Sequence, residues 1–313
     1  MGQGRGIVDN YGRPFLNFRV SITQRCNLRC PYCHREGQPA TQNEMTPTEI
    51  ARISQIAAKL GARDIKLTGG EPLLRRDVVD IVGLVSEIDG IREASLVTNG
   101  TLLTDRLAKH LKENGLARVN VNLPSVDEAT YEELTEGKLE EALKGVKAAI
   151  SAGLTPVKIN MLILKGKNEY QANQMIRFAG SVGAVLQIIE LEPLNLKEEY
   201  YREHHCSLGQ IEDEIAKAAK KMEVRRSMHA RPVYSLGEVK VEMVHPVENS
   251  EFCLHCSRVR LTSDGKIKPC LMTNDGLVDI LGPLRAGESK EKLRGLFVEA
   301  IRGRRPFFGA KPR

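Results

Sequence analysis

The chain has 313 residues and a formal net charge of +6, with hydrophobic and charged fractions of 41% and 27% that are ordinary for a globular protein. No run approaches the ~20 apolar residues of a membrane span, and the first residues lack the apolar core of a secretory signal, so we expect a cytoplasmic protein without membrane contact. Aromatic residues make up only 4% and no Lys/Arg tract occurs, which argues against nucleic-acid binding. The basic balance suits a polyanionic substrate or serves solubility alone.

Apolar, β-rich runs alternate with segments of helical period from residue 18 to about residue 194. Strands are predicted at 18–23, 64–69, 93–99, 118–123, 156–164 and 185–194. Helices are predicted at 46–61, 75–90, 104–115, 139–154 and 170–183. In the first of these helices Thr46 is the expected N-cap, Pro47 suits the first helical position and Glu49 completes a capping box.

This alternation predicts an α/β fold with a parallel sheet and helices outside it. Six units are too few for a closed eight-stranded barrel, so we expect a partial (β/α)6 TIM-like barrel over residues 1–200, with a doubly wound open sheet as the alternative. The rhythm stops near residue 195. Residues 201–313 then form a C-terminal appendage, with a polar helix at 211–222, hairpin-like runs at 235–244 and 260–272, and a final helix at 290–300.

The seven cysteines form two triplets and one isolated residue, Cys206. An odd number in a chain without an export signal argues against a disulfide framework. Cys26, Cys30 and Cys33 form C-x3-C-x2-C in a loop directly after the first predicted strand. Three thiolates can hold three irons of a [4Fe–4S] cluster and leave the fourth iron open. Zinc completed by His34, or three free thiols, are the alternatives.

The second triplet, C-x2-C-x13-C, lies in the appendage and consists of Cys253, Cys256 and Cys270. A zinc ribbon would need a second C-x2-C pair, which is missing, so zinc would have to be completed by His245, His255 or Cys206. A cluster with three protein ligands and one vacant iron fits the spacing better. A vacant iron so far along the chain from the first triplet suggests that it ligates a substrate.

Candidate ligand-binding residues follow the predicted strands. The second strand runs into Gly69, Gly70 and Glu71, and glycines here let the backbone approach a ligand closely, although the same run is an ordinary turn in most proteins. Thr98 and Asn122 lie near the ends of the next two strands, where barrel enzymes carry their sites and where turn residues are also common.

Without a phosphate-binding P-loop, a triphosphate would depend on arginine and lysine side chains. Five cations in or beside predicted strands are candidates: Arg19, Lys66, Lys158, Arg258 and Arg260. The last two alternate along one run, so a strand presents both on one face. Each cation by itself is equally consistent with a solvated surface charge.

The first triplet, with Tyr32 before its third cysteine and Gly-Gly-Glu-Pro after the next strand, resembles the radical S-adenosylmethionine superfamily. The resemblance implies that S-adenosylmethionine chelates the open iron and that one electron from the cluster releases a 5′-deoxyadenosyl radical. It also implies S-adenosylmethionine contacts at Tyr32, Gly69, Gly70, Glu71, Thr98 and Asn122. The family's usual residue at the last of these positions is serine.

From Phe18 to Cys270 the chain resembles the MoaA family of GTP 3′,8-cyclases, which acts at the start of molybdenum-cofactor biosynthesis. The resemblance implies two [4Fe–4S] clusters, the second of which binds the guanine of GTP, and GTP contacts at the five cations. It implies cyclisation of GTP to (8S)-3′,8-cyclo-7,8-dihydroguanosine 5′-triphosphate. It further implies a low-potential electron donor and a downstream cyclic pyranopterin monophosphate synthase; the oligomeric state, including a homodimer, stays open.

Several positions depart from the bacterial family pattern. Gln187 stands in place of arginine, Glu192 in place of methionine, Lys66 in place of arginine and Asp64 in place of lysine, and the chain does not end in Gly-Gly. A divergent, archaeal-like branch explains these departures, and so does a related enzyme with another substrate. A radical enzyme that modifies a peptide, and a zinc-stabilised binding protein, are the competing functions.

Overall fold

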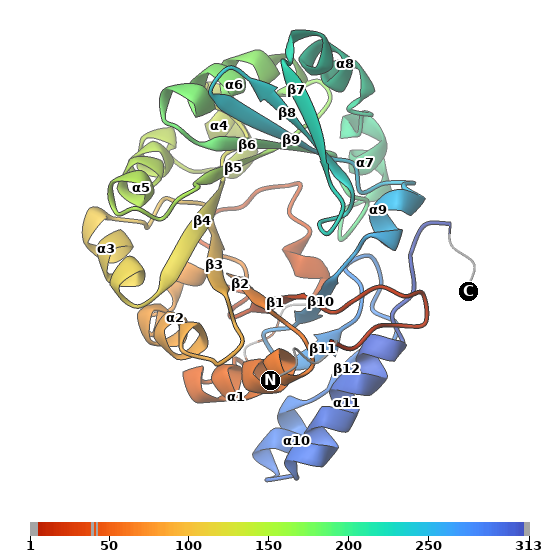
Figure 1. Ribbon diagram of the computed structural model, residues 1–313. Coiled ribbons are helices and arrows are strands. Elements are labelled where there is room, and N and C mark those ends of the chain that lie inside the picture. The colour runs from red at the N-terminus through yellow and green to blue at the C-terminus, as the bar shows by residue number, and fades with distance from the viewer. Residues whose placement is uncertain (1–5, 39–40, 42, 310–313) are drawn as a thin grey trace.

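The computed structural model describes residues 6–38, 41 and 43–309, and its centre is one curved sheet of twelve strands (Figure 1). The strand order is β12-β11-β10-β1-β2-β3-β4-β5-β6-β9-β8-β7. All six predicted barrel strands are present: β1 (Asn17–Ser21), β2 (Asp64–Thr68), β3 (Glu93–Thr98), β4 (Leu116–Asn122), β5 (Lys158–Leu162) and β6 (Val185–Ile189). They pair in parallel, which confirms the partial α/β barrel.

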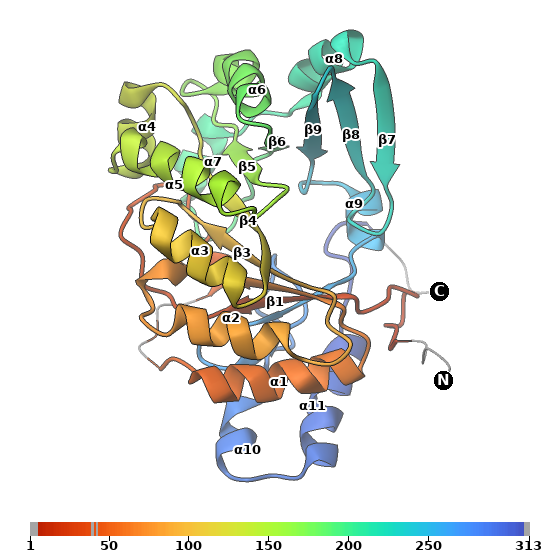
Figure 2. The same ribbon diagram turned by 60° about the vertical axis from the view of Figure 1, so that its left-hand side comes forward.

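Helices cover the convex face of this sheet (Figures 1 and 2). They are α1 (Pro47–Lys59), α2 (Val78–Ser86), α3 (Asp105–Glu113), α4 (Glu128–Thr135), α5 (Leu139–Ser151) and α6 (Ala172–Ser181). The capping box of α1 is confirmed, since the Thr46 hydroxyl accepts from Glu49 N and the Glu49 carboxylate accepts from Thr46 N at 2.8 Å. The short helix α4 was not predicted.

The C-terminal region extends the barrel sheet at both edges. Its elements are α7 (Glu198–His204), α8 (Gly209–Ala218), β7 (Lys221–Arg225), β8 (Arg231–Leu236), β9 (Val239–Val244), α9 (Ser250–Leu254), β10 (Arg258–Leu261), β11 (Lys266–Lys268), β12 (Val278–Asp279), α10 (Leu281–Arg285) and α11 (Lys290–Arg302). Both predicted hairpins form, as β8–β9 and β10–β11. Strand β9 pairs in parallel with β6, and β10 pairs in parallel with β1, so the appendage contributes to the barrel wall.

One predicted element is wrong at its end. The polar helix expected at 211–222 stops at Ala218, and the chain enters β7 at Lys221. This strand is almost wholly exposed and is held by antiparallel pairing with β8, so its side chains show none of the alternation that marks a half-buried strand.

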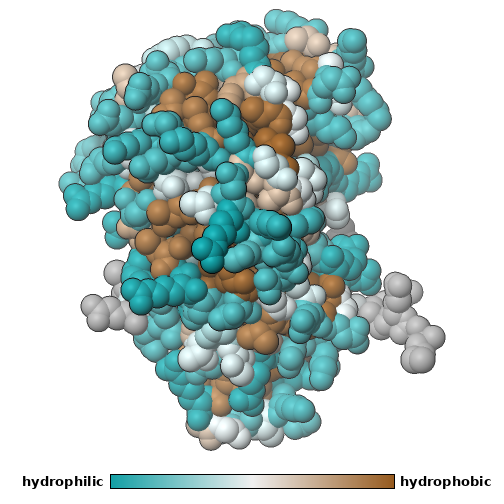
Figure 3. Space-filling model, turned by 90° about the vertical axis from the view of Figure 1, so that its left-hand side faces the viewer, coloured by the Kyte–Doolittle hydropathy of each residue, from teal (hydrophilic) through white to brown (hydrophobic). Residues whose placement is uncertain are grey.

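The core continues beneath the sheet into α11. Phe297 packs between Phe15 and Phe18, with ring centroids 6.4 and 5.6 Å away, and all three side chains are fully buried. The helix-covered face in Figure 3 is mainly hydrophilic with scattered apolar patches. Within the described part of the chain, no helix combines the length and apolar composition of a membrane span.

Candidate active site

A cavity of about 310 Å³ lies inside the barrel and is lined by both cysteine triplets. Of the S-adenosylmethionine positions expected from the sequence, it is lined by Tyr32, Gly69, Gly70 and Asn122. The five expected GTP contacts also line it: Arg19, Lys66, Lys158, Arg258 and Arg260. Residues more than 200 positions apart in the chain therefore share one space, as a two-cluster site requires.

The loop that carries the first triplet is clamped against the loop after β2. Gly70 N donates to Thr23 O at 2.9 Å, and Glu71 N donates to Arg25 O at 2.7 Å. A Cβ atom at Gly69 would lie 2.4 Å from Thr23 O, and one at Gly70 would lie 2.3 Å from Arg25 O. Glycine is thus required here by the close approach of the cysteine loop itself, a reason that differs from the ligand approach expected from the sequence.

Glu71 and Thr98 lie beneath the cavity wall and do not line it. The Glu71 carboxylate is fully buried and accepts from Thr98 Oγ1 at 2.8 Å, Asn99 N at 2.7 Å and Leu73 N at 2.9 Å. Burial raises the pKa of Glu71 to about 7, against these three donors, which lower it. In this arrangement Glu71 joins the loops after β2 and β3 and sets Asn99, which faces the cavity.

Replacing Glu71 by alanine should lower the free energy of unfolding by about 2–4 kcal/mol, because two buried backbone N–H groups lose their acceptor. Urea unfolding of the purified protein measures this difference. Glu140→Ala is the matched control, since Glu140 pairs only with exposed Lys144 and its loss should leave the midpoint unchanged. Equal midpoints for both variants would contradict the joining role of Glu71.

The thiols of the first triplet suit a bound metal cluster better than free ionisation. Burial raises the pKa of Cys30 to about 12, and burial also raises the pKa values of Cys26 and Cys33. At Cys30 and Cys33, the charge of neighbouring thiolates of the same triplet raises the pKa further. Cationic irons would relieve both effects, and the half-buried Tyr32 side chain lines the same cavity.

The second triplet is gathered at one end of the β10–β11 hairpin. Cys253 belongs to α9, Cys256 precedes β10, and Cys270 follows β11. Arg13 Nη1 donates to Cys253 O at 2.9 Å and Arg304 Nη2 donates to Cys256 O at 2.6 Å, which fixes the turn between the two thiols. Burial opposes ionisation of Cys256, but the nearby Arg304 and Arg258 guanidinium groups outweigh it and lower its pKa.

The fourth ligands considered for zinc at the second triplet do not line the cavity that holds its thiols. His245 bonds to the Glu212 carboxylate at 2.7 Å, and His255 Nδ1 lies 3.0 Å from Glu251 O. Cys206 does not line the cavity and packs partly buried against the core. Across the described ranges, no group of three or more His, Cys, Asp or Glu side chains is arranged to hold a single metal ion. The two triplets therefore fit clusters better than mononuclear zinc.

Strand register places four cations in one row across the barrel wall. Arg260, Arg19 and Lys66 are direct partners on β10, β1 and β2, and the row continues through Ser95 to Arg118 on β4. Neighbouring strands are ~4.8 Å apart, so these charges are close enough to repel one another. Glu36 pairs with Arg19 and Arg260, and Glu93 pairs with Arg118 at 2.6 Å, so Lys66 is the cation of this row that has no carboxylate partner among the described residues.

The opposite wall has its own buried carboxylate, Glu242 on β9. It accepts from Lys158 Nζ and Gln187 Nε2, and from Arg225 Nη1 at 2.6 Å. Burial would raise the pKa of Glu242, but Lys158 and Arg225 lower it to about 2. Burial also lowers the pKa of Lys158 to about 8, against the raising effect of Glu242. Gln187, where bacterial relatives carry arginine, is thus held by this carboxylate.

The cavity carries a large excess of positive charge. Eleven arginine and lysine side chains line it, against the two glutamates Glu36 and Glu192. In the described part of the molecule Lys66 and Arg258 form no ion pair with a carboxylate, and burial followed by neighbouring cations lowers the pKa of each. Partly buried cations without carboxylate partners are costly to the fold, so their presence at the cavity indicates an anionic ligand.

A second opening of about 550 Å³ lies at the amino-terminal ends of β1–β4. It shares five cations with the main cavity: Arg19, Lys66, Arg118, Arg225 and Arg258. These side chains therefore stand between the two spaces. Asp64 lines the second opening and not the main cavity, and it pairs there with Arg92 at 3.0 Å. The replacement of the family's lysine by Asp64 therefore does not alter the charge of the main cavity.

Sequence reasoning missed several residues of this site: Glu36, Arg118, Arg225, Arg231 and Glu242. Arg118 could have been found, since polar Arg118, Asn120 and Asn122 alternate with valines along β4. The others gave no such signal, because their positions depend on the non-local pairing of β7, β8 and β9 or on a loop.

Glu192, one of the positions that depart from the bacterial family pattern, lines the cavity and lies 3.9 Å from His34. The last residues of the chain, which lack the terminal Gly-Gly of the bacterial family pattern, lie outside the described residues.

Comparisons with known proteins agree with this arrangement. The Radical SAM superfamily model matches residues 20–179, and the model described as Molybdenum Cofactor Synthesis C matches residues 184–309. A Methanothermobacter marburgensis protein named "Probable GTP 3',8-cyclase" is 44% identical over 96% of this chain and 99% of its own length. A protein of the same name from Methanocaldococcus jannaschii is 43% identical over 97% of this chain and 100% of its own length.

Among solved structures, Streptococcus suis SuiB bound to its precursor peptide SuiA superposes with a TM-score of 0.67 at 16% identity, over 94% of this chain and 67% of that one. At this identity the likeness shows the fold alone. The sequence relatives and the two family models show more, since together they span both cysteine triplets. The chain belongs to the radical S-adenosylmethionine superfamily and, within it, to the MoaA family, whose archaeal members are named probable GTP 3′,8-cyclase.

Proposed function

We propose that this protein converts GTP into (8S)-3′,8-cyclo-7,8-dihydroguanosine 5′-triphosphate, the first step of molybdenum-cofactor biosynthesis. The observation that carries the proposal is one cavity that is lined by both cysteine triplets and by eleven arginine and lysine side chains. The names of full-length relatives at 42–44% identity support the same reaction.

The cofactors are two [4Fe–4S] clusters and S-adenosylmethionine. Cys26, Cys30 and Cys33 would hold the first cluster and leave one iron for S-adenosylmethionine. When bound, these two groups supply a 5′-deoxyadenosyl radical. The protein's own contribution is to bind and orient: Gly69 and Gly70 keep the cysteine loop against the strand ends, and the remaining S-adenosylmethionine positions of the family pattern line or support the same wall.

The second cluster would be held by the second triplet and would leave one iron toward the cavity for guanine. The cationic row then lies within reach of the triphosphate, and Lys66 and Arg258 have no carboxylate to displace. Charge-assisted hydrogen bonds to phosphate contribute about 1.5–3 kcal/mol each. The site therefore binds the nucleotide at two ends and presents the ribose between them.

The proposal extends to partners and to the division of the chain. A low-potential electron donor must reduce the first cluster, and a cyclic pyranopterin monophosphate synthase would consume the product. Residues 1–200 would bind S-adenosylmethionine, and residues 201–313 would carry the second cluster. Self-association as a homodimer stays a prediction that sedimentation would test.

The direct test is anaerobic incubation of the reconstituted protein with GTP, S-adenosylmethionine and dithionite, followed by mass analysis of the nucleotide products. The expected product has the mass of GTP, since cyclisation is an isomerisation, and a new retention time. Formation of 5′-deoxyadenosine without any altered nucleotide would contradict GTP as the substrate.

Replacing Cys256 by alanine should leave the first cluster assembled and S-adenosylmethionine cleavage intact, while cyclised product is lost. The two triplets lie on separate segments, so each can fold its own site. Iron content should fall from about eight to about four per chain. Product formed at the wild-type rate would show that the second triplet is not needed for the substrate.

A further inference from the structure

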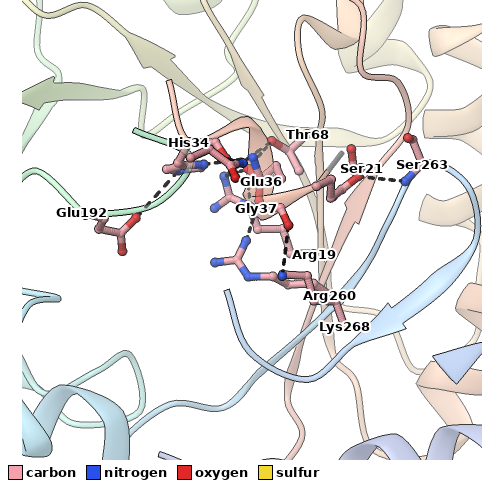
Figure 4. Close-up of polar contacts among 12 residues, drawn as sticks. Arg19, Ser21, His34, Glu36, Gly37, Thr68, Glu192, Arg260, Ser263 and Lys268 are labelled. Carbon is pink, nitrogen blue, oxygen red and sulfur yellow. Dashed lines mark hydrogen bonds and ion pairs between the residues drawn. The ribbon is translucent and has the colours of Figure 1, made fainter. Parts of the chain in front are cut away.

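The segment directly after the first triplet adopts an unusual backbone. Arg35 and Glu36 are consecutive non-glycine residues with φ of 48° and 53°, within the short 3-10 turn Arg35–Gly37. Such a conformation costs on the order of 1 kcal/mol per residue for side chains that lack glycine's freedom. It places the Glu36 side chain inside the barrel, where the residue is only 3% exposed (Figure 4).

Glu36 there collects donors from three strands. Arg19 on β1 donates to Oε1 from Nη2 at 2.6 Å and from Nε at 3.0 Å, and Thr68 Oγ1 on β2 donates to the same oxygen at 3.0 Å. Arg260 on β10 donates to Oε2 from Nη1. Figure 4 shows the carboxylate between the two guanidinium groups. Burial would raise the pKa of Glu36, but these two arginines outweigh it and hold it below the ordinary range.

The carboxylate uses only part of each arginine. Arg19 and Arg260 are direct register partners on neighbouring strands, so without Glu36 their like charges would push the side chains apart. In the described part of the chain, Nη1 of Arg19 and both Nε and Nη2 of Arg260 have no hydrogen-bond acceptor. Both residues line the cavity, so these donors remain for a ligand.

The same segment is tied to the hairpin that leads to the second triplet. The Lys268 ammonium, fully buried on β11, donates to Gly37 O at 3.1 Å and to Thr273 O at 2.7 Å. Ser263 N donates to the Gln38 side chain at 3.2 Å. Residues 36–38 therefore connect the loop of Cys33 rigidly with the β10–β11 hairpin. Within this segment, Glu36 contacts Arg19 and Arg260, the arginines expected to bind the substrate.

We propose that Glu36 is a positioning residue that sets Arg19 and Arg260, and through them the phosphates, at a fixed distance from the loop carrying the first cluster. The proposal rests on the proposed function, because it concerns the same nucleotide. It predicts that Glu36 governs how often radical formation leads to substrate reaction, in addition to how tightly the substrate binds.

The test compares Glu36→Gln and Glu36→Asp with the wild type. The glutamine amide turns a donor toward one guanidinium group, so one arginine is released although the volume is kept. Anaerobic equilibrium dialysis of GTP against the reconstituted protein should show about tenfold weaker binding for Glu36→Gln, as expected for one lost charge-assisted contact. Glu36→Asp keeps the charge and should recover part of the affinity.

In the reconstituted protein, the amount of 5′-deoxyadenosine formed per cyclised nucleotide should rise about tenfold in Glu36→Gln. With GTP deuterated at the ribose 3′ carbon, the fraction of 5′-deoxyadenosine that carries deuterium should fall. A residue with only a structural role would move neither ratio while iron content and melting temperature stay constant. Glu113→Gln is the control, since Glu113 pairs with exposed Lys109 at 3.9 Å on the outer helix α3 and does not line the cavity.

Wild-type affinity and an unchanged product ratio in Glu36→Gln would overturn the proposal. Tighter GTP binding in Glu36→Gln would also overturn it, because Glu36 would then only compete with phosphate for the arginines. Wild-type protein that neither binds GTP nor forms product would overturn the proposed function as well, so the two failures are distinguished by the wild-type measurement.

Discussion

Replacing Cys30 by alanine should abolish the release of 5′-deoxyadenosine from S-adenosylmethionine. Three thiols are the fewest that hold a [4Fe–4S] cluster with one iron free, and all three of the first triplet line the cavity. Chromatography of anaerobic reactions with dithionite measures the loss, which we expect to exceed a thousandfold because the radical source itself is missing.

Cys206→Ala provides the matched control for this experiment. Cys206 is a half-buried thiol outside both triplets and outside the cavity lining, so its variant should keep both clusters and wild-type 5′-deoxyadenosine release. Iron should stay at about eight per chain in Cys206→Ala and fall to about four in Cys30→Ala. Retained cleavage in Cys30→Ala, or lost cleavage in Cys206→Ala, would contradict the assignment of the first triplet.

The barrel could be predicted because its signals are local. Every predicted strand between residues 18 and 194 is present within a few residues, and α1 begins at Pro47 after its expected N-cap. Strands buried on both faces produce continuous apolar runs, and amphipathic helices produce a 3.6-residue period, so each unit is visible in a short window.

The rest of the fold depends on contacts that no short window contains. The parallel pairing of β10 with β1 joins residues about 240 positions apart, and β9 joins β6 in the same way. Strand β7 has exposed, lysine-containing positions and continues the composition of α8, so its sequence favoured helix until pairing with β8 decided otherwise. Tertiary pairing overrides local preference most easily in such short edge strands.

The candidate site shows the same division. Cysteines and cations stand out by type and spacing, and the structure brings both triplets and all five expected cations to one cavity. The carboxylates that organise them do not stand out. Glu36 and Glu242 acquire their positions from a strained loop and from β9, and nothing in their immediate neighbours distinguishes them from solvated glutamates. Which carboxylate pairs with which cation is determined by the fold. The sequence therefore indicated the cations but not the carboxylates that pair with them.

These cations have a cost that makes the phosphate assignment testable by stability as well as binding. Arg258 is partly buried beside Arg260, Arg19 and Arg231, and its desolvation followed by these neighbouring charges lowers its pKa well below the ordinary value. Residues kept for function commonly destabilise the fold that holds them. Replacing Arg258 by an uncharged side chain of similar volume should therefore weaken phosphate binding and, at the same time, stabilise the fold.

Arg258→Met should bind GTP about tenfold to a hundredfold more weakly and, in the same anaerobically reconstituted protein, melt about 2 °C higher. The loss corresponds to one charge-assisted phosphate contact of about 1.5–3 kcal/mol. The gain, on the order of 1 kcal/mol, comes from exchanging a partly buried cation, which has no carboxylate partner among the described residues, for an apolar side chain of similar length. Equilibrium dialysis of GTP and of guanosine, with thermal melts in the absence of ligand, measures both.

The preference for GTP over guanosine decides what Arg258 binds. The wild type should prefer GTP strongly, and Arg258→Met should lose affinity for GTP while guanosine binding stays constant, because only GTP carries the phosphates. Tripolyphosphate alone should raise the melting temperature of the wild type more than that of the variant. Arg285→Met is the control: Arg285 is half-exposed and pairs with Glu49 at 2.7 Å on the outer surface, so neither measurement should change. An unchanged GTP preference in Arg258→Met would place the triphosphate elsewhere, and a lower melting temperature would show that this cation stabilises the fold.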